Sequence, residues 1–479
     1  MSEPVPPRRA DGVDVVPATA ADLQLYADAN RQLGQMQVPV MVSRDRPNER
    51  LFVAVLDGTG NDMNNPAMGE RTGISRIFEQ IRDQQNSGEL TNVATGYLAG
   101  PGTGPHRFDG MRGHTFEERG ESMYRQFIEQ SARWLRDNPD ADIRVAALGF
   151  SRGAEQAAYF TRLVHERGIQ DPAGAVYTTD DTGLVTGVQY TRPPLVAPGQ
   201  VMQAAVLQDP VPTGDPANYD RRLPPSVVSA FQIRARDEPR DQFVDSRHLP
   251  QGLSDGGRSL HVTVPGAHSD IGDAYAANGL GLRNTNMTMQ FVNGLVDNGR
   301  PLLQLRPETQ APDRNLIHDS EQHMPWVYTR RGFDRDGLRD ERNDLAPQPW
   351  YQRTDPAMTR REPMDQGLAD RLPYRTLPMA PVPTEPDGRR AALDAAPTPQ
   401  MCVAPPAESA FDRLARAAQS GDVDGSRGIG RQFLESGPGQ AWLEQGRVFN
   451  LEQATQREQT AMPPPVVEQP QRQTGGMCR

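Results

Sequence analysis

The hydrophobic residues of this chain gather in short continuous runs, not in a strict alternation with polar residues. The first run covers 51–56, six consecutive apolar residues that are followed by Asp57 and Gly58. Such a run, closed by a turn signal, is typical of a strand in a parallel sheet that is covered on both faces. Further runs of this kind predict strands at 143–148, 201–207, 227–233 and 260–264.

Helical periodicity occurs between these runs. Residues 117–136 place Met123, Phe127 and Ile128 on one face, and 154–167 carry an alanine-rich face. A weaker apolar stripe predicts a helix at 19–35. Strands that alternate with helices in this way predict an α/β fold, with a mostly parallel, doubly wound sheet and helices on both faces.

Changes of composition predict how the chain is organised. Proline becomes frequent after about residue 346, which indicates an extended segment in place of a packed core. The predicted parts are a polar lead-in, an α/β catalytic domain with a possible insertion or lid, a proline-rich linker or arm, a small helical module and a disordered tail, at residues 1–49, 50–345 with 168–200, 346–408, 409–460 and 461–479.

A G-x-S-x-G motif centred on Ser151 stands between a predicted strand and a predicted helix. The glycines permit a sharp strand-to-helix turn that exposes the serine hydroxyl, and the helix N-terminus offers N–H groups to a developing oxyanion. This context predicts an α/β-hydrolase-like domain with Ser151 as nucleophile. A second match centred on Ser254 has no predicted strand before it and no helix after it, so we expect an ordinary loop serine there.

A serine nucleophile of this fold is followed in the chain by an acid and then by a histidine. Asp209 comes directly after the predicted strand 201–207, and His268 lies on the loop after 260–264. Because open α/β sheets place their sites at the carboxyl ends of strands, we expect Ser151, Asp209 and His268 to converge. The alternatives left open are His318 as the base and Asp215, Asp237 or Asp270 as the acid.

The turn after the first strand is a candidate for the oxyanion hole. The backbone N–H of Gly58 or Thr59 could act there together with that of Arg152, which follows the nucleophile. The alternatives are an ordinary solvated Gly-Asn turn and a turn that Asp57 holds by accepting hydrogen bonds from its own backbone.

Composition excludes several kinds of chemistry. The 479 residues carry a formal charge of −11, and all 51 basic residues are arginine, so lysine-dependent catalysis and general nucleic-acid binding are not expected. Two cysteines give no zinc site or disulfide framework. Asp334, Asp336 and Asp340 are spaced like calcium ligands but lack the remaining ligand pattern, so we expect a solvated charged loop. The sequence therefore predicts no metal and no cofactor.

The same residues carry a family resemblance. The stretches 56–61, 149–154, 209–211, 231–243 and 265–272 together resemble the α/β-hydrolase domain of the type VI secretion lipase effectors, which are antibacterial phospholipases. The resemblance implies Ser151, Asp209 and His268 as the triad and a phospholipid or related acyl ester as substrate. The chain departs from the family at Gly60, where a bulky residue is usual, and at Asp273, where a further glycine is usual.

These observations predict a serine lipase or phospholipase effector that acts at a membrane surface. Since there is no signal-peptide core and no apolar run near the length of about 18 residues that a span requires, we expect a signal-peptide-independent route from the producer's cytoplasm into a target cell. A secretion-apparatus component and a cognate immunity protein are the expected partners. The alternatives are a non-catalytic binding or structural protein on this scaffold and a soluble carboxylesterase of another substrate.

Overall fold

A computed structural model of the chain describes residues 11–64, 71–103, 109, 113–181, 183–323, 339, 341–342, 345 and 362–384. The chain divides into two compact units, 1–389 and 390–479, and all described residues belong to the first. The predicted helical module at 409–460, the tail at 461–479 and the charged loop around Asp336 lie outside the described residues.

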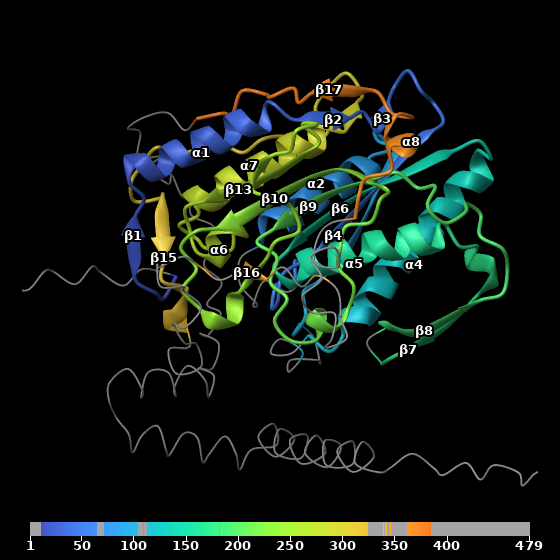
Figure 1. Ribbon diagram of the computed structural model, residues 1–479, viewed down its shortest axis with the longest axis horizontal. Coiled ribbons are helices and arrows are strands. Elements are labelled where there is room, and N and C mark those ends of the chain that lie inside the picture. The colour runs from blue at the N-terminus through green and yellow to red at the C-terminus, as the bar shows by residue number, and fades with distance from the viewer. Residues whose placement is uncertain are drawn as a thin grey trace, which may run out of the picture. The chain divides into compact units, whose positions relative to one another are not determined.

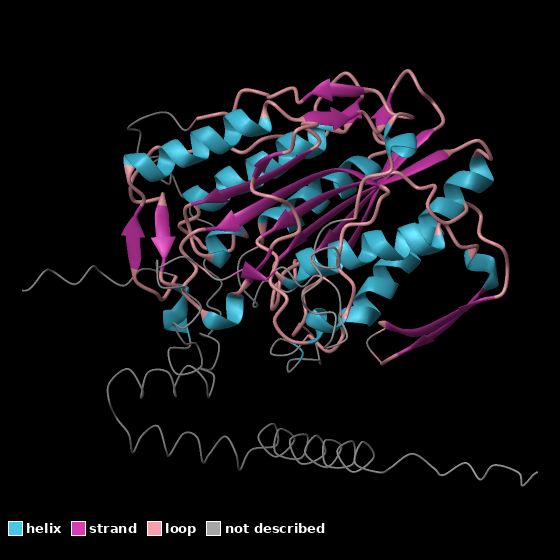
Figure 2. Ribbon diagram, viewed as in Figure 1, coloured by secondary structure: helices cyan, strands magenta, loops and turns pink. Residues whose placement is uncertain are grey.

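A seven-stranded sheet forms the centre of the fold (Figures 1 and 2). Its order is β12-β13-β10-β9-β6-β4-β5, and every strand is parallel to its neighbours except β12, which is antiparallel to β13. The bounds are β4 Glu49–Leu56, β5 Val93–Leu98, β6 Asp142–Phe150, β9 Gln203–Gln208, β10 Val227–Ala235, β12 Gly252–Leu253 and β13 Ser259–Val264.

All five predicted strands are confirmed, as is the doubly wound α/β class. The sequence pattern missed β5, because Thr95 and Gly96 interrupt its apolar run. It also missed β12, so the expectation that no strand precedes Ser254 is wrong.

Helices cover both faces of the sheet, as Figure 2 shows. Alternate side chains of β4 serve the two faces: Leu51 and Val53 join a core with α1 (Ala20–Leu33), α2 (Gly73–Asn86) and α7 (Gly279–Gly294). Phe52 and Ala54 join a second core with α4 (Phe116–Asp137) and α5 (Arg152–Arg167). Burial of both faces explains why the strand is a continuous apolar run.

The predicted helices correspond to α1, α4 and α5, whereas α2 and α7 were not predicted. Every residue of α7 is buried, including polar ones such as Asn284 and Gln290. A helix with no solvated face has no periodic contrast between polar and apolar positions, so its period cannot be read from the sequence. The failure to predict α2 has no such cause, because Ile74, Ile77 and Ile81 form an apolar stripe at helical spacing that the sequence does show.

Segments on both sides of the central domain pack against it. Leu33, Met36, Val38 and Met41 are fully buried in the core, although residues 1–49 have a mostly polar composition. The strands of residues 1–49 pair across long sequence distances: β1 (Val15–Pro17) with β15 (Leu316–His318), β2 (Gln37–Pro39) with β17 (Tyr374–Thr376), and β3 (Val42–Ser43) with β14 (Val296–Asp297). Within the central domain, β11 (Asp245–Ser246) pairs with β16 (Glu341–Arg342).

Residues 175–190 form an antiparallel hairpin outside the central sheet, β7 (Ala175–Thr179) with β8 (Val185–Tyr190). It rests on α4, where the Val185 N–H donates to the Ser122 hydroxyl over 2.9 Å. The remaining short helices are α6 (His268–Ile271), α8 (Gln366–Ala369) and single 3₁₀ turns at Pro172–Gly174, Asp215–Asn218, Asp241–Phe243 and Ser320–His323. None of the helices in the described part of the chain combines the length and the apolar character needed to cross a bilayer.

Candidate active site

Ser151 occupies a sharp turn between β6, which ends at Phe150, and α5, which begins at Arg152. Its φ of 60° and ψ of −129° lie in a region that non-glycine residues rarely adopt, at a cost of about 1–3 kcal/mol. The flanking glycines are required by contact: a Cβ on Gly149 would lie 2.2 Å from the Gly153 carbonyl oxygen, and one on Gly153 would lie 2.2 Å from the Leu56 carbonyl oxygen. The strand-turn-helix context predicted for the motif is confirmed.

Ser254 has a different setting. It lies in the turn between β12 and β13, where its N–H donates to the Ser259 carbonyl over 2.9 Å and its hydroxyl accepts the Ser259 N–H over 3.0 Å. Ser254 is therefore a turn serine whose side chain stabilises a hairpin.

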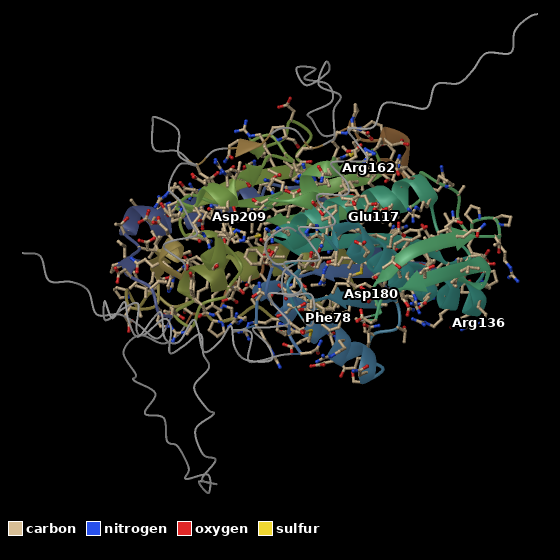
Figure 3. The ribbon with its side chains drawn as sticks, turned by 90° about the horizontal axis from the view of Figure 1, so that it is seen from below. Phe78, Glu117, Arg136, Arg162, Asp180 and Asp209 are labelled. Atoms are coloured by element: carbon tan, nitrogen blue, oxygen red, sulfur yellow. The ribbon has the colours of Figure 1, made fainter. Side chains whose placement is uncertain are left out.

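Asp209 follows β9, the neighbour of β6 in the sheet. The register pairs Phe150 with Gln208, and the Ser151 N–H donates to the Gln208 carbonyl over 2.9 Å. Ser151 and Asp209 thus leave adjacent parallel strands at the same level. Asp209 is fully buried, and its backbone has a φ of 42°. Figure 3 shows Asp209 far from Arg136, which lies near the C-terminal end of α4.

His268 begins the short helix α6, after β13, and faces Asp209. Its Nδ1 lies 2.5 Å from Oδ2 of Asp209. The imidazole stacks on the ring of Phe150 at 4.7 Å and meets the edge of Phe243 at 4.8 Å. With the Nδ1 proton donated to Asp209, Nε2 is left as the basic nitrogen. Neither Nε2 nor the Ser151 hydroxyl has a hydrogen-bond partner among the residues that the structure describes.

The protonation states of this pair suit a resting base. Burial lowers the pKa of His268 and outweighs the opposing effect of Asp209, so the imidazole is neutral near pH 7. Burial raises the pKa of Asp209, but the Arg339 guanidinium and the His268 hydrogen bond lower it further than burial raises it, so this carboxylate stays ionised.

The rival histidine, His318, lies on β15 and binds other carboxylates. Its Nδ1 is 2.6 Å from Oδ1 of Asp270, its Nε2 is 3.3 Å from Asp11, and its ring stacks on Tyr275 at 3.8 Å. The structure therefore brings His268, and not His318, onto Asp209.

The candidate oxyanion turn after β4 is organised by Asp57. This buried carboxylate accepts hydrogen bonds from the Gly58 N–H at 2.8 Å, the Tyr97 hydroxyl at 2.8 Å and the Thr72 hydroxyl at 3.0 Å. The Gly58 N–H is thus already engaged, which matches the alternative in which Asp57 holds the turn. The Thr59 N–H donates to no described residue and is the better candidate of the two. Burial raises the pKa of Asp57 to about 6 despite these three donors.

The side chain of Arg152 connects the elbow to the oxyanion turn. Its Nη1 donates to the Thr59 hydroxyl over 2.8 Å and its Nε donates to the Thr213 carbonyl over 2.8 Å. Because both bonds fix the position of the guanidinium, Arg152 is suited to holding Thr59 beside the nucleophile.

Sequence reasoning missed a shell of buried ion pairs around His268. Glu238 accepts the His268 N–H over 3.1 Å and binds Arg240 through two hydrogen bonds of 2.6 and 2.8 Å. Arg339 donates to Asp209 over 2.6 Å. Glu238 and Arg240 lie in one of the stretches that carry the family resemblance, but no sequence signal points to Arg339.

Asp273 explains why a glycine is usual at its position. Its φ of 58° lies in the left-handed region that glycine adopts most readily. Here the conformation is held by side-chain contacts, since Asp273 binds Arg306 and accepts the Asn278 amide over 2.6 Å. The chain past α6 thus keeps a left-handed turn with a different residue.

The segment that contains the Ser151 elbow matches a known protein family. Residues 50–181 match the family model described as T6SS, phospholipase effector Tle1-like, catalytic domain. The predicted family resemblance is confirmed. The matched segment is less than half of the chain; it contains the Asp57 turn and the Ser151 elbow and ends before Asp209 and His268.

Solved structures give weaker likenesses. An uncharacterized protein from Pseudomonas aeruginosa aligns with a TM-score of 0.35 and 13% identity, over 63% of this chain and 51% of that one. The Tle1 effector bound to the VgrG spike of the type 6 secretion system aligns with a TM-score of 0.26 and 23% identity, over 47% of this chain and 51% of that one. YbtT, a type II thioesterase of yersiniabactin biosynthesis, gives 0.19 and 13%, over 49% and 90%.

The chain therefore spans about half the length of the first two structures. TM-scores this low do not support an inference about function. The search of curated proteins finds no match.

Proposed function

We propose that this chain is a serine phospholipase effector in which Ser151 is the nucleophile, His268 the general base and Asp209 the acid that orients His268. The observation that carries the proposal is the elbow: a strained serine inside the segment that matches a phospholipase catalytic domain, beside a strand that ends in a buried aspartate–histidine pair. No metal or cofactor is needed for this chemistry.

The reaction is acyl transfer. His268 Nε2 takes the proton of the Ser151 hydroxyl as the oxygen attacks the ester carbonyl, and Asp209 stabilises the imidazolium through Nδ1. His268 then protonates the leaving alcohol. Water, deprotonated by the same nitrogen, attacks the acyl-enzyme and releases a fatty acid. Stacking on Phe150 and the edge contact with Phe243 keep the imidazole in one orientation throughout.

The negative charge of the tetrahedral intermediate falls near the N-terminus of α5. The N–H groups of Arg152 and Thr59 are the proposed donors, with the helix dipole adding a favourable field. Asp57 and the Arg152 side chain support this hole by fixing the turn that contains Thr59.

The family match of residues 50–181 supports a proposal for the substrate class and the delivery route. We propose membrane phospholipids as substrate, delivery into a target bacterium by the type VI apparatus, and a component of that apparatus and an immunity protein as partners. Expression in the periplasm of a test bacterium should then arrest growth, and the Ser151→Ala chain should be harmless.

Hydrolysis of defined vesicles tests the proposal. Wild-type protein and Ser254→Ala, the variant at the second G-x-S-x-G motif, should release fatty acid and lysophospholipid from phosphatidylethanolamine and phosphatidylglycerol vesicles, whereas Ser151→Ala should not. Mass spectrometry of the lysophospholipid identifies the ester bond that is cut. Lipid hydrolysis by Ser151→Ala would contradict the proposal, and Ser151-dependent hydrolysis of short soluble esters alone would favour the carboxylesterase alternative.

A further inference from the structure

The carboxylate of Asp209 is shared between a base and a fixed cation. Oδ2 faces Nδ1 of His268 at 2.5 Å, while Oδ1 accepts the Arg339 Nη1–H at 2.6 Å and the Ala235 N–H at 2.8 Å. All three side chains are at most 5% exposed. The acyl-transfer mechanism does not require an arginine paired with the acid of the triad. The pairing of Arg339 with Asp209 therefore needs a separate explanation.

Arg339 is held by the backbone and not by Asp209 alone. Its Nε donates to the Phe243 carbonyl over 2.7 Å, its Nη2 donates to the same oxygen, and its own carbonyl accepts the Arg234 Nη2–H over 2.6 Å. The next described residues, β16, pair in parallel with β11. These bonds place the guanidinium on Asp209 in one orientation, and the Phe243 that they fix is also the residue whose ring touches His268.

The carboxylates that pack around His268 and Arg339 are paired with cations. Asp209 pairs with Arg339 at 2.6 Å, Glu238 with Arg240 at 2.6 Å and Asp245 with Arg234 at 3.2 Å. Asp270, on the same helix as His268, pairs with His318, and Asp237 pairs with Arg236. Asp209 is therefore already neutralised when His268 accepts a proton, so it stabilises the imidazolium less than an unpaired carboxylate would.

We propose that Arg339 is a positioning residue that fixes Asp209 for His268 and, by neutralising that carboxylate, keeps His268 deprotonated into mildly acidic conditions. This inference rests on the proposed triad. Its consequence is that the pH at which hydrolysis falls off on the acid side depends on a residue that never touches the substrate.

The pH profile of kcat on a soluble ester separates this role from a purely structural one. Arg339→Gln keeps a hydrogen-bond donor but removes the charge, so Asp209 should hold the imidazolium more tightly and the pKa of His268 should rise. The acid limb should then move to higher pH by about one unit, which is roughly a tenfold loss of activity below the limb. Arg339→Lys keeps the charge and should leave the limb in place with a lower kcat. KM should change little in either variant.

Arg283→Gln is the matched control, because Arg283 forms a buried pair with Glu308 at 2.6 Å that involves none of the triad residues. It should lower the unfolding temperature without moving the limb. The rate at which a fluorophosphonate labels the full chain, followed against pH, should show the same shifts without any turnover.

An unmoved acid limb in Arg339→Gln, with activity reduced equally at every pH, would overturn the proposal. If that variant does not fold, Arg339→Lys decides: a limb that moves there, although the charge is kept, would also overturn it. Lipid or ester hydrolysis that survives Ser151→Ala would instead refute the proposed function, which keeps the two failures distinguishable.

Discussion

The imidazole of His268 stacks on the ring of Phe150, with centroids 4.7 Å apart and planes inclined by 27°. Phe150 is the last residue of β6 and immediately precedes Ser151, so the strand that presents the nucleophile also supports the base. Gly272 takes part in the same packing, because a Cβ there would lie 2.3 Å from the Phe150 ring.

Replacing Phe150 by a smaller, non-aromatic residue should reduce activity more than stability. Phe150→Leu leaves space beside His268, and we expect kcat to fall about tenfold to a hundredfold because the base loses its fixed position. The matched control is Phe160→Leu on α5, another buried phenylalanine, which should lose a similar free energy of unfolding, about 1–3 kcal/mol, with kcat unchanged. Equal effects on kcat in both variants would show that Phe150 has only a packing role.

The two candidate bases, His268 and His318, should respond differently to removal. His268→Ala should lower kcat by about 10⁴ or more, as expected for loss of a triad base. His318→Ala should retain most activity per folded molecule but lose about 3–5 kcal/mol of stability, because Asp270 is left as a buried carboxylate without its partner. Kinetics and urea unfolding of both variants test this, and the reverse pattern would assign the base to His318.

The oxyanion turn should depend on Asp57. Asp57→Ala removes the acceptor of the Gly58 N–H and of two hydroxyl groups, so the turn that contains Thr59 should lose its shape. We expect kcat to fall by about 10²–10³, the loss typical of one oxyanion donor, with KM little changed. Asp62→Ala, at a half-buried position of the same turn where the carboxylate accepts, among the described residues, only the Asn64 N–H, serves as the control and should behave as wild type. A large rise in KM for Asp57→Ala would contradict this account.

Acid should destabilise the fold through His261, a strand residue whose Nδ1 donates to the Leu249 carbonyl over 3.0 Å. Burial lowers its pKa to about 4, below the value of about 6.5 in the unfolded chain. A histidine with a lowered pKa favours folding fully above pH 6.5, and this stability is lost as the pH falls from 6.5 towards 4.

The variant His261→Asn, which keeps a donor for Leu249 but cannot titrate, isolates this effect. Between pH 7 and pH 4.5 the wild-type protein should lose about 2–3 kcal/mol more free energy of unfolding than the variant does. Urea unfolding at the two pH values measures the difference. Equal losses in the two proteins would show that His261 is not held neutral in the folded state.

Much of the fold could be predicted from the sequence because the strands are buried on both faces and the motif is local. The elbow at Ser151 depends partly on contacts within a few residues, such as that of Gly149 with the Gly153 carbonyl, and local contacts leave a local signature. Asp209 and His268 could likewise be predicted as candidates, because each of them follows a predicted strand.

What the sequence could not predict depends on contacts between distant segments. The sequence favoured His268 because it follows a predicted strand, but it could not exclude His318, because the partner of each histidine depends on how α6 and β15 pack. Arg339 lies in an Asp-rich stretch expected to be solvated, yet it is buried against Asp209 because the neighbouring residues 341–342 pair with β11. A helix such as α7, buried on every side, has no amphipathic pattern to find.

The central claim is that Ser151 is an activated nucleophile, and covalent labelling tests it most directly. The full chain is treated with a fluorophosphonate and the modified peptide is identified by mass spectrometry. We predict one labelled site, Ser151, with labelling kept in Ser254→Ala, lost in Ser151→Ala and strongly slowed in His268→Ala. Failure to label Ser151 in the folded wild-type protein, or equal labelling of Ser254, would contradict the account.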